Sequence, residues 1–135
     1  MEQQLFKTLE VSRIYTLEVV EAMPENLYEF RPANSVRSFK EQVRHILYGI
    51  KWWEDNYISK LETEWNPPSV DYTKNELIKN LNLAYESLKK TMLRIGDTDA
   101  RIPGFYATLD HITHHRAQVI IYLRCNSIAP PEYKF

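Results

Sequence analysis

Apolar side chains recur at helical spacing in four separate segments of the chain, and this pattern restricts the fold more than any other feature. Residues three or four apart share one face of an α-helix. The segments run from Glu2 to Met23, from Ser38 to about Ile58, from Thr73 to Ile95 and from Phe105 to about Asn126. None alternates as a β-strand does, and no Asn-Gly or Asp-Gly hairpin signal occurs. Four amphipathic helices can bury their apolar stripes, the faces formed by these residues, against one another, so we expect an all-α four-helix bundle.

Three helix ends carry local signals. Ser38 with Glu41, and Thr73 with Glu76, have the spacing of a capping box, in which a hydroxyl and a carboxylate satisfy free amide groups of the first turn. Gly96 is predicted to cap the carboxyl end of the third helix, because glycine adopts the required left-handed conformation. These signals predict where the second and third helices begin and where the third ends.

The connection between the second and third helices is long and contains two prolines. Residues 59–72 read SKLETEWNPPSVDY, and Pro67 and Pro68 cannot continue a helix. A connection of this length lets the second and third helices run parallel. The expected topology is therefore up-down-down-up.

Size and composition predict a single domain over residues 1–135, since 135 residues with 44% hydrophobic content suit one core. Seventeen basic and eighteen acidic residues give a net charge of -1, which favours neither nucleic acid nor a membrane surface as partner. The single Cys125 cannot form an intramolecular disulfide, the amino terminus lacks an apolar signal region, and no apolar run spans a bilayer. A cytoplasmic location is expected.

The histidines indicate a metal site. His111 and His115 are four residues apart and lie on one helical face, while His45 lies on the second helix among apolar positions. If these two helices are antiparallel, His45 and His115 differ in level by about one helical turn, which is within side-chain reach, so the three imidazoles could hold one ion. The alternative is that His111 and His115 face solvent and His45 is a hydrogen-bonded core histidine. His114 lies off that face and is interpreted as a surface or interface residue.

Three imidazoles without a fourth protein ligand form an open site, in which water or substrate completes the coordination. Zn, Ni, Fe and Mn all suit such a site. The sequence has no H-E-x-x-H motif on the fourth helix and no Glu-x-x-His pairs, so zincin chemistry and a di-iron site are disfavoured. We expect a mononuclear site.

Several neighbouring residues have two interpretations. Gln118 and Thr108 lie one turn from a candidate ligand, and either could hydrogen-bond an imidazole or be ordinary surface polarity. Arg116 is expected to pair with a carboxylate of a neighbouring helix or subunit. Cys125 is too far along the helix to ligate and is expected to be a small buried hydrophobe.

Four aromatic residues could line a pocket near the metal, although such side chains are more often buried in the core. They are Tyr48, Trp52, Trp53 and Trp65.

Three segments, FRPANSVRSFKEQVRHILYG, HITHHRAQVIIYLR and IAPPEY, resemble those of the DinB-like superfamily of metal-binding four-helix bundles, which includes low-molecular-weight thiol S-transferases. The resemblance spans nearly the whole chain. It implies the up-down-down-up topology, a homodimer, and His45, His111 and His115 as the metal ligands.

By the same resemblance the activity would be a metal-dependent thiol S-transferase, or a related hydrolase, acting on a small molecule with a low-molecular-weight thiol as possible co-substrate. No catalytic side chain can be assigned from the sequence. The alternative function is a non-catalytic, dimeric metal-binding module of a stress response.

Overall fold

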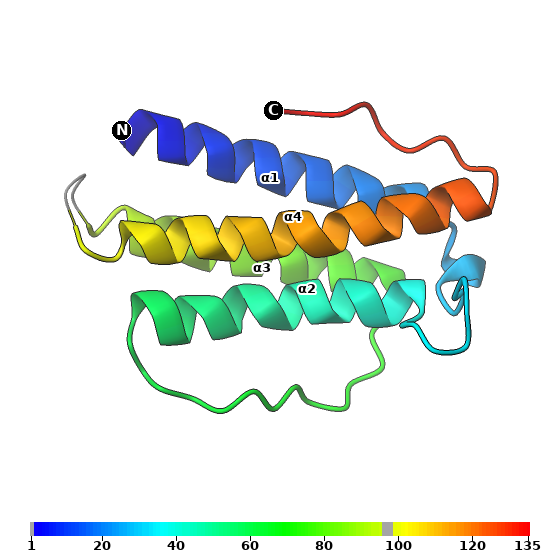
Figure 1. The fold of residues 1–135 in the computed structure, drawn as a ribbon, viewed down its shortest axis with the longest axis horizontal. Coiled ribbons are helices and arrows are strands. Elements are labelled where there is room, and N and C mark those ends of the chain that lie inside the picture. The colour runs from blue at the N-terminus through cyan, green and yellow to red at the C-terminus, as the bar shows by residue number, and fades with distance from the viewer. Residues whose placement is uncertain (1, 96–98) are drawn as a thin grey trace.

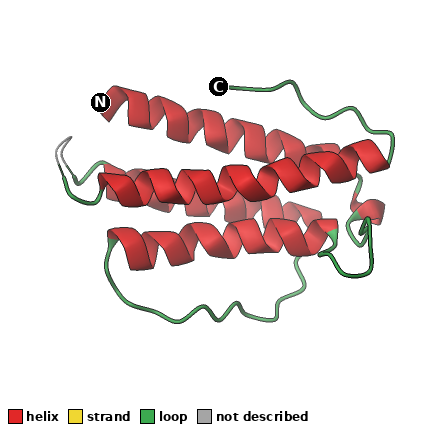
Figure 2. Ribbon diagram, viewed as in Figure 1, coloured by secondary structure: helices red, strands yellow, loops and turns green. Residues whose placement is uncertain are grey.

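The computed structural model of the protein describes residues 2–95 and 99–135. Its four α-helices are α1 (Glu2–Ala22), α2 (Phe39–Trp53), α3 (Lys74–Met92) and α4 (Ile102–Cys125). A 3-10 turn, η1 (Glu25–Leu27), follows α1, and a π-helical turn, η2 (Glu54–Ile58), continues α2. The described residues contain no strand (Figure 2). The expected all-α, four-helix class is confirmed.

The helices pack so that α1 and α2 each lie against both α3 and α4. Figure 1 shows α2 and α3 running in one direction and α1 and α4 in the other, which is compatible with the expected up-down-down-up order. Residues 59–73 return along the outside of α2 without helical structure. This long segment therefore covers part of α2 and leads directly into α3.

The predicted apolar stripes form the core between the helices. Most of their residues are buried, and four stripe positions are only partly buried: Leu47, Trp53, Ala84 and Ile120. The buried members are Leu5, Leu9, Tyr15, Val19, Met23, Val43, Ile46, Ile50, Leu77, Leu81, Leu88, Met92, Ile95, Phe105, Leu109, Ile112, Val119 and Leu123. Burial of these side chains is the main source of stability for a bundle of this size.

One predicted capping box is complete and the other is not. The Thr73 hydroxyl accepts a hydrogen bond from the Glu76 amide, and the Glu76 carboxylate accepts one from the Thr73 amide. Ser38 likewise accepts from the Glu41 amide at 3.1 Å. The Glu41 carboxylate, however, pairs with Arg31 at 2.6 Å, so its predicted role in a capping box is wrong.

The outer helix boundaries differ by a few residues from the sequence prediction. Helix α3 ends at Met92, and Gly96, the predicted cap, lies outside the described residues. Helix α4 begins at Ile102, one turn before Phe105. Pro103 is compatible with this start because amide groups in the first turn of a helix form no intrahelical hydrogen bond, so the missing N–H of proline breaks none.

The π-helical turn packs tightly against the start of α4. A Cβ atom added at Gly104 would lie 2.5 Å from the backbone oxygen of Tyr57, well inside van der Waals contact. Only glycine therefore lets α4 approach η2 this closely. This contact helps to set the separation of α2 and α4, the two helices that carry the candidate metal ligands.

Candidate metal centre

Three histidines from two helices converge at the interface of α2 and α4. His45 comes from α2, and His111 and His115 come from successive turns of α4. One nitrogen of each lies within 4.8 Å of the other two, and the Nε2 atoms of His45 and His115 are 3.0 Å apart. The structure thus brings together all three residues that the spacing singled out, and the group could hold a metal ion.

Two glutamine side chains hold the His115 imidazole in place. His115 Nδ1 lies 3.1 Å from Gln118 Oε1 and 3.2 Å from Gln42 Oε1. The amide nitrogen of Gln42 donates to Gln118 Oε1 at 2.8 Å, which links the two glutamines. An amide oxygen only accepts hydrogen bonds, so Nδ1 carries the proton. The lone pair of His115 is consequently on Nε2, the atom that faces His45.

His111 is held against the backbone of α2 at Gly49. A Cβ atom at Gly49 would lie 2.5 Å from His111 Cε1 and 2.9 Å from its Nδ1. The Nδ1 atom is buried and has no hydrogen-bond partner among the described residues. A buried polar nitrogen without a partner is costly, and a ligand to the ring would offset part of that cost.

The electrostatic environment keeps the three imidazoles neutral. Burial, together with the positive charge that His115 would carry, lowers the pKa of His45 to about 3. Burial and the same neighbour lower the pKa of His111 to about 4, and burial lowers that of His115 as well. The cationic Arg37 side chain acts in the same direction on all three. Neutral imidazole is the form that binds metal ions.

This pKa depression predicts a pH dependence of stability in the metal-free protein. The unfolded chain, with ordinary histidines, binds more protons than the folded one below about pH 6.5. The contribution of these neutral histidines to the free energy of unfolding is therefore fully present above that pH. It is lost as the pH falls toward the pKa values of the folded protein. A His45→Asn variant should show a shallower fall in the free energy of unfolding between about pH 6.5 and 5 than the unaltered protein. Urea titrations in the presence of a chelator measure this, and equal slopes would contradict it.

The donor set fits a small divalent ion. Two nitrogens bound to a tetrahedral zinc at about 2.0–2.1 Å would be about 3.3 Å apart, close to the separation of the His45 and His115 nitrogens. The alternative of solvent-facing histidines does not hold, because His115 is buried and His45 and His111 are half-buried. The hydrogen bond of His45 joins it to another candidate ligand rather than to a core carbonyl or carboxylate.

Aromatic rings surround the three histidines on the side away from the core. The Trp65 ring lies 5.1 Å from that of His45, and the Trp53 ring lies 5.5 Å from that of His111, centroid to centroid. Tyr48 packs edge-on against Trp65, and Trp52 contacts both tryptophans. None of these four aromatic residues is fully buried. They form a wall beside the site rather than part of the core.

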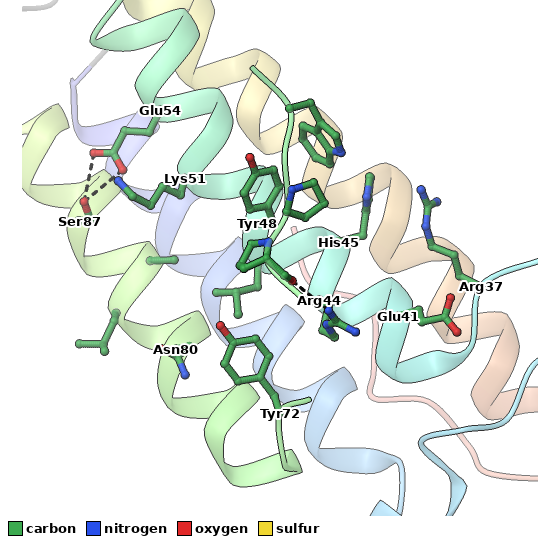
Figure 3. Close-up of a pocket in the computed structure, with 16 residues that line it drawn as sticks. Arg37, Glu41, Arg44, His45, Tyr48, Lys51, Glu54, Tyr72, Asn80 and Ser87 are labelled. Carbon is green, nitrogen blue, oxygen red and sulfur yellow. Dashed lines mark hydrogen bonds between the residues drawn. The ribbon is translucent and has the colours of Figure 1, made fainter. Parts of the chain in front are cut away.

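A cavity of about 670 Å³ opens beside His45, between α2, α3 and the 59–73 connection (Figure 3). Tyr48 and Trp65 line it, whereas His111 and His115 do not. The cavity therefore reaches the histidine cluster through His45. The other lining residues are Arg37, Glu41, Arg44, Leu47, Lys51, Glu54, Pro67, Pro68, Tyr72, Asn80, Leu83, Ala84 and Ser87.

Three predictions about neighbouring residues are decided by the structure. His114 is exposed and does not join the cluster, as expected. Gln118 contacts a candidate ligand, whereas the Thr108 hydroxyl donates to the backbone oxygen of Gly104 within its own helix. Cys125 is exposed at the end of α4, so the expectation of a buried cysteine is wrong.

Arg116 departs from its predicted role. It is buried and donates to the Thr16 hydroxyl at 3.2 Å, with its guanidinium 4.4 Å above the Tyr15 ring. No carboxylate lies within 4.0 Å of it among the described residues, so the expected pairing with a neighbouring helix of this chain is wrong. A hydroxyl and an aromatic face partly replace the ion pair.

Two residues of the site were missed from the sequence. Gln42 lies three residues before His45, and helical spacing alone places it on the same face, but a lone glutamine carries no chemical signal. Gly49, four residues after His45, lies on that face as well. Its role becomes visible only when His111 is placed opposite.

Two solved structures are similar to this chain over nearly its whole length. A DinB-like protein from Bacillus subtilis superposes with a TM-score of 0.74 at 16% identity, covering 98% of this chain and 96% of its own. A DinB family member from Exiguobacterium sibiricum gives a TM-score of 0.74 at 16% identity, covering 99% and 95%. The chain has the DinB-like fold. No protein-family model and no curated protein matches the sequence.

The shared fold confirms the resemblance to DinB-like proteins that the sequence segments indicated. Within the ranges described, no helix of this DinB-like bundle combines the length and the apolar character needed to cross a membrane.

Proposed function

We propose that this DinB-like protein binds one divalent metal ion through His45, His111 and His115 and uses it on a small-molecule substrate. The convergence of three neutral imidazoles, with one nitrogen of each within 4.8 Å of the others, carries the proposal. Within the described part of the chain, no carboxylate or thiol completes this group. A three-ligand set leaves a coordination position for a substrate.

The chemistry best supported is transfer of a low-molecular-weight thiol to an electrophilic substrate, with hydrolysis as the related reaction. A bound divalent ion is a Lewis acid that favours the deprotonated form of a thiol or water. The protein's own residues position and shield that ion. Gln42 and Gln118 hold His115 in one orientation, and the rings of Trp53 and Trp65 lie beside that of His111. Zn, Ni, Fe and Mn are the candidate ions.

The cavity beside His45 supports a small molecule as the substrate, since its volume lies in the range typical of ligand pockets. A homodimer in the cytoplasm is proposed on the resemblance to DinB-like proteins. The exposed apolar side chain of Ile121 on α4 offers surface for a second copy.

A non-catalytic metal-binding role is the second candidate. It is favoured by the absence of any acidic or thiol side chain from the described histidine group, which leaves no obvious proton acceptor. Under this alternative the metal would stabilise the interface of α2 and α4 without turnover.

Metal content, stability and turnover test the proposal together. Elemental analysis should find close to one divalent ion per chain. Chelation should lower the free energy of unfolding by about 4 kcal/mol where free metal exceeds the dissociation constant by about a thousandfold. The zinc-loaded protein should consume cysteine in the presence of chlorodinitrobenzene faster than the chelated protein does. Metal-dependent stability without turnover would select the non-catalytic role, and absence of bound metal would exclude both.

A further inference from the structure

The cavity beside the histidine cluster contains two arginines whose charge is not neutralised. Arg37 and Arg44 both line it, and Figure 3 shows Arg37 at the same end as His45. Neither guanidinium has a carboxylate within 4.0 Å among the described residues. Arg44 donates only to the backbone oxygen of Pro68, at 3.1 Å.

The acidic residues of the same cavity are already engaged. Glu41 pairs with Arg31 outside the cavity at 2.6 Å. Glu54 is buried and accepts hydrogen bonds from the hydroxyls of Ser87 and Thr91. The third cation of the cavity, Lys51, pairs with Asp55. Of the charged groups in the cavity, Arg37 and Arg44 therefore have neither an ion pair nor a hydroxyl partner among the described residues.

The backbone holds Arg37 at its position beside the cluster. The Tyr122 hydroxyl of α4 donates to the Arg37 carbonyl at 2.7 Å, and the next residue, Ser38, is the buried cap of α2. The Arg37 backbone is fixed to both helices of the metal site, while its side chain is exposed and makes no hydrogen bond to any residue that the structure describes. The backbone thus fixes where the Arg37 side chain leaves the chain, and its guanidinium is available to a ligand.

Charge balance also favours an anion. Three neutral imidazoles leave the full charge of a divalent ion uncompensated, and Arg37 adds a further positive charge on the same side. Guanidinium groups bind carboxylate and phosphate oxygens through paired N–H donors. The lining of the cavity also includes three aromatic side chains, Tyr48, Trp65 and Tyr72.

We propose that this cavity binds a small molecule with an oxyanion group held by Arg37 and Arg44 and an apolar body against the aromatic wall. The inference rests on the proposed function for its link to the metal, because it places the substrate of that same site. It adds the chemical class of that substrate: an organic carboxylate or phosphate rather than a neutral or cationic molecule.

Calorimetric titration of the full-length, zinc-loaded protein with benzenesulfonate tests the inference. This probe carries an oxyanion and an apolar ring but is a poor metal ligand, and benzyl alcohol is its neutral counterpart. Benzenesulfonate should bind about tenfold more tightly than benzyl alcohol. Arg37→Gln and Arg44→Gln should each remove most of this preference, and Arg44→Lys should restore part of it.

Arg124→Gln is the matched control, because it removes one positive charge from an exposed position of α4 outside the cavity. It should leave the preference unchanged. Equal binding of the two probes, or equal losses in Arg37→Gln and Arg124→Gln, would overturn the inference. Elemental analysis of the same samples tests the metal site separately. Protein without metal that still binds the anion through Arg37 would refute the proposed function but not the anion site.

Discussion

Replacing His111 with alanine is expected to lower the affinity for Zn²⁺ by at least about a hundredfold, since even changes in residues that merely support a ligand cost ten- to hundredfold. His111 supplies one of only three nitrogens in the group. The fold should persist, because the side chain is half-buried and its buried Nδ1 has no partner among the described residues. Removing an unsatisfied polar atom costs the metal-free protein little. Competition with a chromophoric zinc chelator measures the affinity.

His114→Ala provides the matched control for this prediction. His114 lies on the same helix, three residues after His111, but it is exposed and outside the cluster. Its ring lies 4.9 Å from that of His115, and its Nε2 lies 3.4 Å from Gln118 Nε2, but it supplies no nitrogen to the group. Its replacement should therefore cost less than about tenfold in zinc affinity, well below the loss in His111→Ala. Comparable affinity in the unaltered protein and in both variants would show that the three histidines do not form the site.

The sequence was sufficient for the helices and for placing His111 and His115 on one face, because both depend on spacing along a single helix, whereas His45 was added to the group by the assumed antiparallel packing and by the resemblance to DinB-like proteins. An apolar stripe such as Leu77, Leu81 and Leu88 specifies which face of α3 is buried, whatever the partner. The step from His111 to His115 places two imidazoles on one face in the same way. Both predictions needed only the 3.6-residue period of the α-helix.

Features that depend on the choice of partner across an interface could not be predicted. Glu41 has the spacing of a capping residue, but its carboxylate forms an ion pair with Arg31, ten residues earlier, instead of accepting a bond from the helix cap. Arg116 was expected to meet a carboxylate, and instead packs over Tyr15 and donates to Thr16. In each case several partners satisfy the same side chain, and tertiary packing selects among them.

The choice between a core position and a pocket wall for the aromatic residues of α2 was likewise beyond the sequence. Pattern alone assigns Trp53 to the apolar stripe of α2, where burial in the core is the simplest outcome. Trp53 is instead only partly buried and lies beside His111, because α4 packs against this part of α2. Spacing along α2 does not reveal which side chain of α4 lies opposite.

Gly49→Ala is expected to weaken zinc binding by about ten- to hundredfold, as displacement of a ligand imidazole does, without destabilising the metal-free protein. The added Cβ would lie 2.5 Å from His111 Cε1, so the ring must move. A side chain can rotate away at small cost, and alanine in a helix interior gains about 1 kcal/mol over glycine. The zinc affinity should therefore fall, while the midpoint of thermal unfolding measured in chelator should rise.

Gly104→Ala is the informative control, because its Cβ would meet backbone rather than a side chain. The Tyr57 oxygen lies 2.5 Å from that position and cannot rotate away, so overpacking should cost about 1–3 kcal/mol of stability even without metal. Gly49→Ala should thus lose metal and keep stability, whereas Gly104→Ala should lose stability first. Unchanged zinc affinity in Gly49→Ala would mean that His111 can bind from a second orientation, and would remove Gly49 from the determinants of the site.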